Sequence, residues 1–196
     1  MGAAHGAGRG VESMRAELPP APLVDRPLPI RLGPRPTTTW GMPHMQLGVV
    51  PDPDLLAELA RRAFALPDVV ERPTVVSVPG ARGLWLTDGA PIARPEAIVA
   101  GRELSHIHPD GSMHLALPAA RAREAVAGGW AEPHPLAAVL GLDGLVLVYT
   151  PRTRNELDVL WSLLVESYRF VTGRDPRSGG GEEASPAAVV RATDSG

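Results

Sequence analysis

The chain has 196 residues, of which 44% are hydrophobic and 21% are charged, values typical of one globular domain. Its net charge is -3, its 19 basic residues are all arginine, and it has no cysteine. No basic stripe marks a surface for nucleic acid or an anionic membrane, and a metal site is limited to histidine and carboxylate ligands. No apolar run approaches the ~20 residues of a membrane helix, and no signal peptide is evident. We therefore expect a soluble, cytoplasmic protein.

The two ends of the chain differ in composition from its middle. Residues 1–38 close with "LPPAPLVDRPLPIRLGPRP", in which the proline density favours an extended backbone that is either disordered or wrapped over the body. Residues 174–196 have the Gly, Ser, Pro and Glu content of a flexible tail. The predicted folded domain is therefore residues 39–173.

The first predicted elements are a helix and a hairpin. Residues 52–67 predict the helix, with Asp52 as its N-cap and Pro67 at its end. The β-branched run "PTVVSVPG", residues 73–80, and the segment "GLWLT", residues 83–87, predict two strands joined by a glycine-containing turn.

The second half of the chain predicts two more helices and three more strands. "ELSHIHPDGSMHLALP", residues 103–118, reads as a second hairpin, and "PAARAREAVAGG", residues 118–129, as a helix that ends at glycine. After a proline-rich loop, "LVLVYT" is an apolar run of strand length. The last helix opens with a capping box from Thr153 to Glu156 and carries an apolar stripe. The predicted class is α+β, a single domain with a mainly antiparallel sheet packed with about three helices.

The second hairpin carries the strongest chemical signal. "His-Pro-Asp-Gly" suits a type I turn with Gly111 in the left-handed conformation, so that His108 pairs with Ser112. Counting outward places His106 opposite His114, and alternation of side chains puts all three histidines on one face. The apolar residues Ile107, Met113, Leu115 and Leu117 then occupy the other face. Under the same alternation Glu103 points away from the histidines.

Further side chains are candidates for the same site. In "GWAEPHPLA", Glu132 and His134 lie between prolines that hold the backbone extended, which suits a pocket wall. Trp85 and Trp130 offer apolar wall area. Arg152 has the two-pronged donor geometry that binds a carboxylate or enolate oxygen, although such an arginine more often pairs with a helical carboxylate.

Three roles for the histidines fit these observations. They can act as general base and oxyanion stabilisers in a metal-free small-molecule site, because imidazole titrates near neutral pH. His106, His108 and His114, with His134 or Glu132, can instead bind zinc, iron or copper. The third role is structural, with the imidazoles bonded to backbone carbonyls or to Glu132 on a solvated sheet face.

Five segments in this order resemble the luciferase-domain family, which includes the fungal luciferases and bacterial proteins of unassigned role. The segments are "RPTTTWGMPHMQL", "VSVPGARGLWL", "ELSHIHPDGSMHLALP", "GWAEPHPLA" and "LVYTPRTRNEL", and they span roughly residues 35–173. The resemblance implies a pocket for a small aromatic or enolic molecule. In the fungal enzymes it implies oxidation of 3-hydroxyhispidin by molecular oxygen with emission of light, and the fungal enzymes are associated with an N-terminal membrane anchor.

The positions that match the family's histidine motifs are His106, His108, His114 and His134, with Glu132 adjacent. From the resemblance we expect an oxygenase-type enzyme that acts on an enolic or phenolic substrate. Molecular oxygen is its expected cosubstrate, with no further cofactor, and a small molecule is its expected partner. A histidine-ligated metalloprotein and a non-catalytic binding module are the alternatives.

Overall fold

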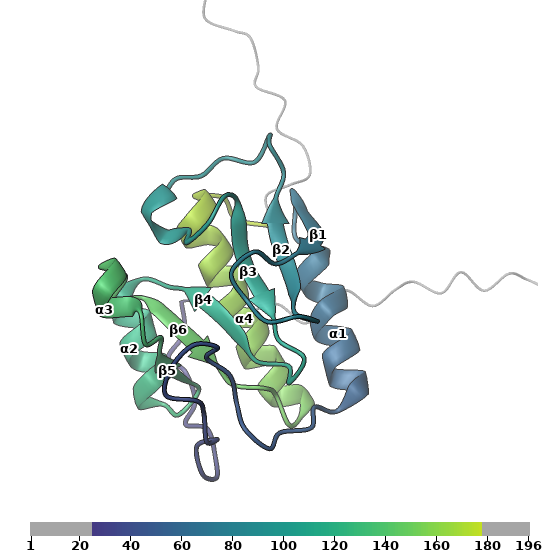
Figure 1. Ribbon diagram of the computed structural model, residues 1–196, viewed down its shortest axis with the longest axis vertical. Coiled ribbons are helices and arrows are strands. Elements are labelled where there is room, and N and C mark those ends of the chain that lie inside the picture. Colours follow the sequence, from purple (N-terminus) through teal and green to yellow (C-terminus); the bar gives the residue numbers. More distant parts are fainter. Residues whose placement is uncertain (1–24, 178–196) are drawn as a thin grey trace, which may run out of the picture.

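The computed structural model describes residues 25–177, and both predicted tail ends, residues 1–24 and 178–196, lie outside the described part. It has the α+β architecture expected from the sequence, with one antiparallel sheet and helices packed on it (Figure 1). The strands are β1 (Val69–Pro73), β2 (Arg82–Leu86), β3 (Glu103–Ile107), β4 (Met113–Ala116), β5 (Ala131–Pro133) and β6 (Leu145–Val148). The α-helices are α1 (Pro53–Phe64), α2 (Ala119–Ala127), α3 (Ala137–Leu140) and α4 (Arg154–Thr172), and a 3₁₀ turn spans Pro95–Ala97.

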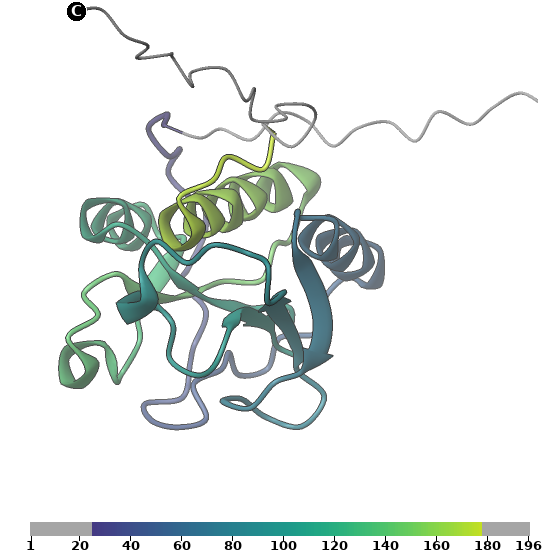
Figure 2. The same cartoon turned by 90° about the horizontal axis from the view of Figure 1, so that it is seen from above.

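The sheet has the strand order β1-β2-β3-β4-β6-β5, and each neighbouring pair is antiparallel. Helices α1, α4 and α2 lie side by side on one face of it, as Figure 2 shows from above. The segment that precedes α1 passes to the opposite face, where loops rather than long helices cover the sheet. The two faces therefore have different surroundings, and a polar site can form on the face without the long helices.

Helix α4 provides most of the apolar contact on the helical face. Its predicted stripe is buried as expected, including Leu157, Leu160, Leu164 and Tyr168, each at most 1% exposed. The hydroxyl oxygen of Thr153 accepts from the Glu156 N–H, which confirms the predicted N-cap. Helix α4 packs on α1 and β4, so the core lies between the helices and the sheet.

The first helix has the predicted start, but the first hairpin needs a correction. Asp52 caps α1 with its side chain. The first strand of the hairpin is Val69–Pro73, not residues 73–80 as the β-branched run suggested. Thr74 and Val75 donate instead to the Glu103 carboxylate, so residues 74–81 form the connection between the two strands. Tertiary hydrogen bonds override strand propensity here.

Two short elements in the proline-rich loop had no signal in the sequence. Strand β5 has only three residues and pairs with β6 at the sheet edge. Helix α3 is a single turn of four residues. Proline at both sides of His134 concealed β5, because proline argues against a strand except at an edge.

Residues 25–38, assigned from the sequence to the proline-rich lead, wrap over the body of the protein. The Leu28 N–H donates to the Glu124 carboxylate at 2.7 Å, and the Arg31 N–H donates to the Gly128 carbonyl at 2.9 Å. These contacts tie the segment to α2. The exact boundary of the domain stays a prediction.

The turn of the second hairpin has the predicted geometry. The Gly111 N–H donates to the His108 carbonyl at 2.9 Å, and Gly111 has a φ of 83°. The His108 N–H donates to the Ser112 carbonyl at 2.9 Å, as the register requires. A methyl group on Gly111 would lie 3.0 Å from Thr150 Cγ2.

We therefore expect Gly111→Ala to lower the free energy of unfolding by about 1–3 kcal/mol, because an L side chain is strained at this φ and the added carbon crowds Thr150. Chemical unfolding followed by circular dichroism measures the change. Gly41→Ala is the matched control, since nothing lies within 4 Å of its added carbon; we expect a change below about 0.5 kcal/mol there. Equal stability of the two variants would contradict the assigned turn.

Candidate functional site

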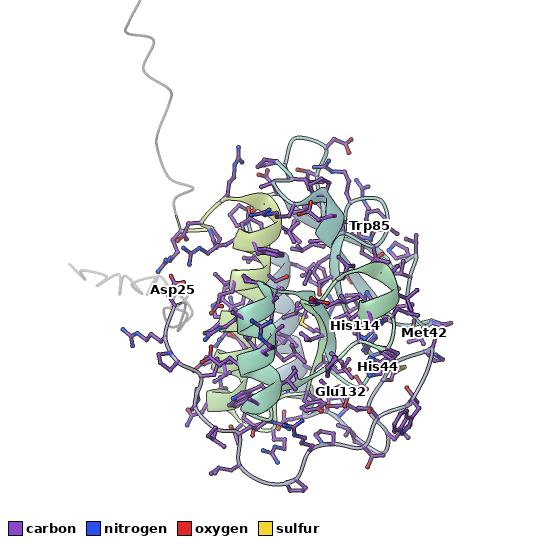
Figure 3. The ribbon with its side chains drawn as sticks, turned by 90° about the vertical axis from the view of Figure 1, so that its left-hand side faces the viewer. Asp25, Met42, His44, Trp85, His114 and Glu132 are labelled. Atoms are coloured by element: carbon purple, nitrogen blue, oxygen red, sulfur yellow. The ribbon has the colours of Figure 1, made fainter. Side chains whose placement is uncertain are left out.

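Five histidine rings meet on the sheet face opposite α4. The centroids of neighbouring rings lie 4.5 to 5.4 Å apart, and all five side chains are buried. Figure 3 shows two of them together with Glu132, on the other side of the sheet from α4. The histidine cluster consists of His44 before α1, His106 in β3, His108 in the β3–β4 turn, His114 in β4 and His134 after β5.

The register of the β3–β4 hairpin brings three of these rings together, as predicted. His106 and His114 are direct partners across the strands. The ring of His108 lies 4.8 Å from each of them. Ile107 and Met113 point to the opposite face, where both are at most 1% exposed in the core. One sheet face therefore carries the imidazoles and the other carries the core.

His44 belongs to the cluster, and sequence reasoning did not single it out. Its ring stacks on that of His114 with centroids 5.4 Å apart and planes inclined by 17°. The backbone next to it is anchored two residues later, where the Gln46 N–H donates to the Asp110 carboxylate at 2.9 Å. His44 lies outside any helix or strand, so no periodicity could orient it, and only its place in the motif "WGMPHMQL" marked it.

Glu103 is also part of the site, which corrects the expectation that it points away from the histidines. Its Oε1 lies 3.0 Å from His106 Nδ1, and the carboxylate is buried. Leu84 is paired with Ser105 whereas Trp85 is paired with Glu103, so Leu104 is an extra residue in β3. Such a bulge breaks the regular alternation of side chains and returns Glu103 to the histidine face.

Glu132 and His134, which the sequence offered as candidates for a pocket wall, reach the cluster from the β5 edge. Glu132 Oε1 accepts from His44 Nε2 at 2.6 Å, and its other oxygen accepts from the Tyr149 hydroxyl at 3.0 Å. The ring of His134 lies edge-on to that of His114 with centroids 4.5 Å apart. His134 Nδ1 accepts from the Leu136 N–H at 3.1 Å.

The hydrogen bonds fix where the protons of the neutral rings lie. A carboxylate only accepts, so His106 Nδ1 is protonated and donates to Glu103. His106 Nε2 then accepts from His114 Nδ1, at 3.0 Å. His114 Nε2 is left with its lone pair free. We assign these tautomers from the hydrogen-bond network.

A second chain of hydrogen bonds orients His108. The Ser112 hydroxyl donates to Asp110 Oδ1 at 2.7 Å, so its oxygen accepts from His108 Nδ1 at 2.9 Å. His108 Nε2 is therefore the unprotonated nitrogen of that ring. The arrangement holds a proton-accepting nitrogen in a fixed orientation, as a general base requires.

Two ring nitrogens of the cluster are buried without any hydrogen-bond partner among residues 25–177. They are His44 Nδ1 and His114 Nε2. Because His44 Nε2 donates to Glu132, its Nδ1 carries a lone pair, as His114 Nε2 does. A buried acceptor without a donor costs about 1–3 kcal/mol, so such atoms point to a functional role.

Burial favours the neutral form of His108, His114 and His134. It lowers the pKa of His108 to about 3 and the pKa of His134 to about 4, and the nearby histidines add to the shift. Burial, with the same kind of neighbours, also lowers the pKa of His114. Burial alone would raise the pKa of Glu103, but the hydrogen bonds from His106, Thr74 and Val75 outweigh it and the net shift is downward. At neutral pH the site therefore offers lone pairs rather than imidazolium charges.

The other predicted ligand contacts lie away from the cluster. Arg152 donates to the Glu156 carboxylate and to the Leu32 carbonyl, so it joins the lead segment to the start of α4. The Trp85 indole donates to the Pro73 carbonyl, and Figure 3 shows this residue apart from His114. Trp130 donates to the Pro29 carbonyl. In the described part none of the three has a hydrogen bond or ring contact with the cluster, and their role in ligand binding stays a prediction.

The space beside the cluster is small. A cavity of about 30 Å³ is lined by His106, His114 and Glu103, and Val76 and Val99 are among its other lining residues. This volume holds about one water molecule, whereas sites for organic ligands usually measure about 300–1,000 Å³. Residues 74–81, which contribute Val76, cover the cluster on this side.

Two sets of three histidines can hold a metal ion by geometry. In each set, one ring nitrogen from every residue lies within 4.8 Å of the other two. The first set, His106, His108 and His114, is the one expected from the sequence. The second consists of His44, His114 and His134.

Comparison with known proteins bears on what this cluster does. Residues 101–167 match the family model of the luciferase domain. Over these residues the chain is similar to the luciferase domain. The resemblance expected from the sequence motifs is thus confirmed, and the matched residues contain four of the five clustered histidines. His44 lies outside the matched region.

The similar proteins are fungal luciferases. The luciferases of Armillaria gallica and Armillaria ostoyae are each 32% identical to this chain over 169 residues, covering 76% of this chain and 62% of the relative. The luciferase of Neonothopanus nambi is 31% identical over 109 residues, covering 49% of this chain and 40% of the relative. The chain thus spans less than two thirds of the length of these relatives.

No solved structure matches the chain significantly. Among the helices of residues 25–177, none is both long enough and apolar enough to cross a bilayer.

The lowered histidine pKa values predict acid sensitivity of the folded protein. In the unfolded chain these imidazoles bind protons near pH 6.5, while in the folded protein His108 and His134 stay neutral to about pH 3 and 4. The unfolded state therefore binds more protons as the pH falls below about 6.5, and stability drops by up to about 1.4 kcal/mol per pH unit for each histidine.

Urea unfolding between pH 7.5 and 5, in buffer with a chelator, measures this slope before most carboxyl groups titrate. His108→Gln should give a shallower slope, because it removes one of the neutral imidazoles. A stability that does not change over this range would show that the rings are solvated in the folded protein.

Proposed function

We propose that this chain is an enzyme that oxidises a small enolic or phenolic molecule with dioxygen at the histidine cluster. The observation that carries the proposal is the set of five buried imidazoles, four of them within the region that matches the luciferase domain. The similar fungal proteins are named luciferases. Light emission is not part of the proposal, because the chain spans only 62% of those relatives.

His108 is the proposed general base. Its Nε2 accepts the proton of the enol hydroxyl, and its Nδ1 stays hydrogen-bonded to Ser112 and through it to Asp110. The resulting enolate is electron-rich enough to react with dioxygen. Its carbon forms a bond to one oxygen atom, and the electron pair of the enolate reduces dioxygen to the level of a peroxide.

The proton held by His108 is then returned to the oxygenated product. Burial lowers the pKa of His108 to about 3, so the neutral ring is a weak base that holds the proton only transiently, and the protonated ring is a strong acid. It returns the proton to the peroxide anion, and the product leaves this step as a hydroperoxide while His108 is neutral again. The step consumes one dioxygen per substrate and needs no external reductant.

An organic substrate requires more room than the cavity of about 30 Å³ offers. The proposed opening involves residues 74–81, since Val76 is one of the residues that line this cavity, and it also has to expose His108, which does not line it. Two hydrogen bonds from Thr74 and Val75 to Glu103 hold the segment in place. In the proposed reaction, this segment opens for the substrate and closes over the complex.

The test is oxygen consumption with a panel of hydroxypyrones and catechols. We expect His108→Gln to lower the rate at least about 100-fold, the usual contribution of a general base, because glutamine can still donate to Ser112 but cannot accept the proton. Arg61→Ala, at an exposed position that pairs with Glu58, is the control variant prepared and assayed in the same way.

Circular dichroism and the unfolding midpoint check that His108→Gln remains folded. If no compound of the panel is consumed, while the parent and His108→Gln bind the same compounds equally well, the chain is a binding module and the enzymatic proposal is wrong.

A further inference from the structure

The two unpartnered ring nitrogens belong to neighbouring residues of the cluster. His44 Nδ1 and His114 Nε2 are both lone-pair nitrogens, and the two side chains are 2% and 8% exposed. Their tautomers are set by hydrogen bonds at the other ring nitrogen: Glu132 accepts from His44, and His106 accepts from His114. A neutral imidazole whose other nitrogen donates to a carboxylate, directly or through a further group, is the form that binds metal ions.

His134 supplies a third nitrogen. Its ring centroid lies 4.5 Å from that of His114 and 5.3 Å from that of His44, and one nitrogen from each ring lies within 4.8 Å of the other two. His134 Nδ1 now accepts from the Leu136 N–H, a bond that ligation would give up or rearrange. That loss is about 1 kcal/mol, against apparent binding energies of about 10–16 kcal/mol for structural zinc sites.

We propose that His44, His114 and His134 form a binding site for a divalent first-row transition-metal ion. Three neutral nitrogen donors suit zinc, copper, nickel, cobalt or iron, whereas magnesium and calcium prefer oxygen ligands. A set of three histidines leaves a further coordination position open, as in catalytic rather than structural sites.

The surrounding carboxylates complete the site. Glu132 orients His44 through a hydrogen bond of 2.6 Å to its Nε2. Glu103 orients His114 through His106, because Glu103 accepts from His106 Nδ1 at 3.0 Å and His106 Nε2 accepts from His114 Nδ1 at 3.0 Å. Such outer partners fix the ring and make its ligand nitrogen a better donor. The two acidic groups also balance the charge of a divalent ion in this buried environment.

The other set of three, His106, His108 and His114 of the β3–β4 hairpin (the hairpin set), explains the two unpartnered nitrogens less well. An ion held by His106, His108 and His114 would replace the proton between His106 Nε2 and His114 Nδ1. His114 Nε2 would then carry a proton with no acceptor, and His44 Nδ1 would still have no partner. An ion at His44, His114 and His134 satisfies both nitrogens and leaves the hydrogen bonds of His106 and His108 intact.

This inference goes beyond the proposed oxidation and does not depend on it. His108 keeps its hydrogen bonds to Ser112 and remains available as the base. A cation at His114 would add attraction for an enolate oxygen, which five neutral imidazoles lack. Metal binding and oxygen consumption are separate measurements, so either can fail alone.

The experiment uses the full chain, purified without chelator and then stripped and titrated with Zn²⁺ and Co²⁺. We expect one equivalent by calorimetry, a rise in the thermal midpoint with Zn²⁺, and visible absorption from Co²⁺ with nitrogen ligands. Histidine ¹⁵N shifts of the zinc-loaded protein should show ligation through Nδ1 of His44 and through Nε2 of His114.

The variants separate the two histidine sets. We expect His44→Ala and His114→Ala to weaken Zn²⁺ binding at least about 100-fold, and Glu132→Gln to weaken it about 10–100-fold by loss of the outer carboxylate. His108→Ala is the matched control, another buried imidazole of the same cluster, and should bind within a few-fold of the parent. If the alanine variants do not fold, the ¹⁵N shifts of the parent decide between the sets.

Two results would overturn the inference. The first is the absence of stoichiometric Zn²⁺ or Co²⁺ binding by the stripped parent chain. The second is binding that His44→Ala retains and His108→Ala loses, which would place the ion at the hairpin set. Oxygen consumption by the stripped and the loaded protein, measured in parallel, tests the proposed function independently of both outcomes.

Discussion

The Asp110 carboxylate is the interaction on which the geometry of the site depends. One of its oxygens accepts from the Ser112 N–H at 2.8 Å and from the Ser112 hydroxyl, which fixes the turn and orients His108. The other accepts from the Gln46 N–H, which holds the backbone two residues after His44. Because side chains alternate along a strand, a slip of one residue at this turn would move His114 into the core. One buried side chain therefore sets the register of the hairpin and the position of the fifth histidine.

The placement of charge explains how five imidazoles can be buried together. Burial lowers the pKa of His108, His114 and His134, and the carboxylates of Glu103, Glu132 and Asp110 lie around the cluster, each engaged by hydrogen bonds. The stability of the fold comes from the opposite face of the same strands, where Met113 and Leu115 are fully buried against the helices. The two ring nitrogens that lack a hydrogen-bond partner among residues 25–177, His44 Nδ1 and His114 Nε2, are the ones assigned to the proposed metal site.

The sequence predicted the parts of the site that local rules determine. The turn residues and the period of two were enough to place His106 opposite His114, and a capping box with an apolar stripe was enough to define α4. Glu103 was misplaced because the bulge at Leu104 arises from pairing with β2, which no local pattern records. His44 was missed because its position depends on the hydrogen bond from the nearby Gln46 N–H to Asp110, which is 64 positions away from Gln46. Contacts of this kind come from the tertiary fold, and a single sequence gives them no periodic signal.

The contribution of His44 means that the matched luciferase domain, residues 101–167, does not contain the whole site. That region supplies four rings and the carboxylates Glu103 and Glu132. The segment before α1 supplies His44. The His44 ring forms a hydrogen bond with the Glu132 carboxylate and stacks on the His114 ring. Without it, Glu132 would keep only the Tyr149 hydroxyl as a side-chain partner, and the His114 ring would lose its stacked neighbour. The proposed site is therefore built from the matched region together with the segment before α1 that supplies His44.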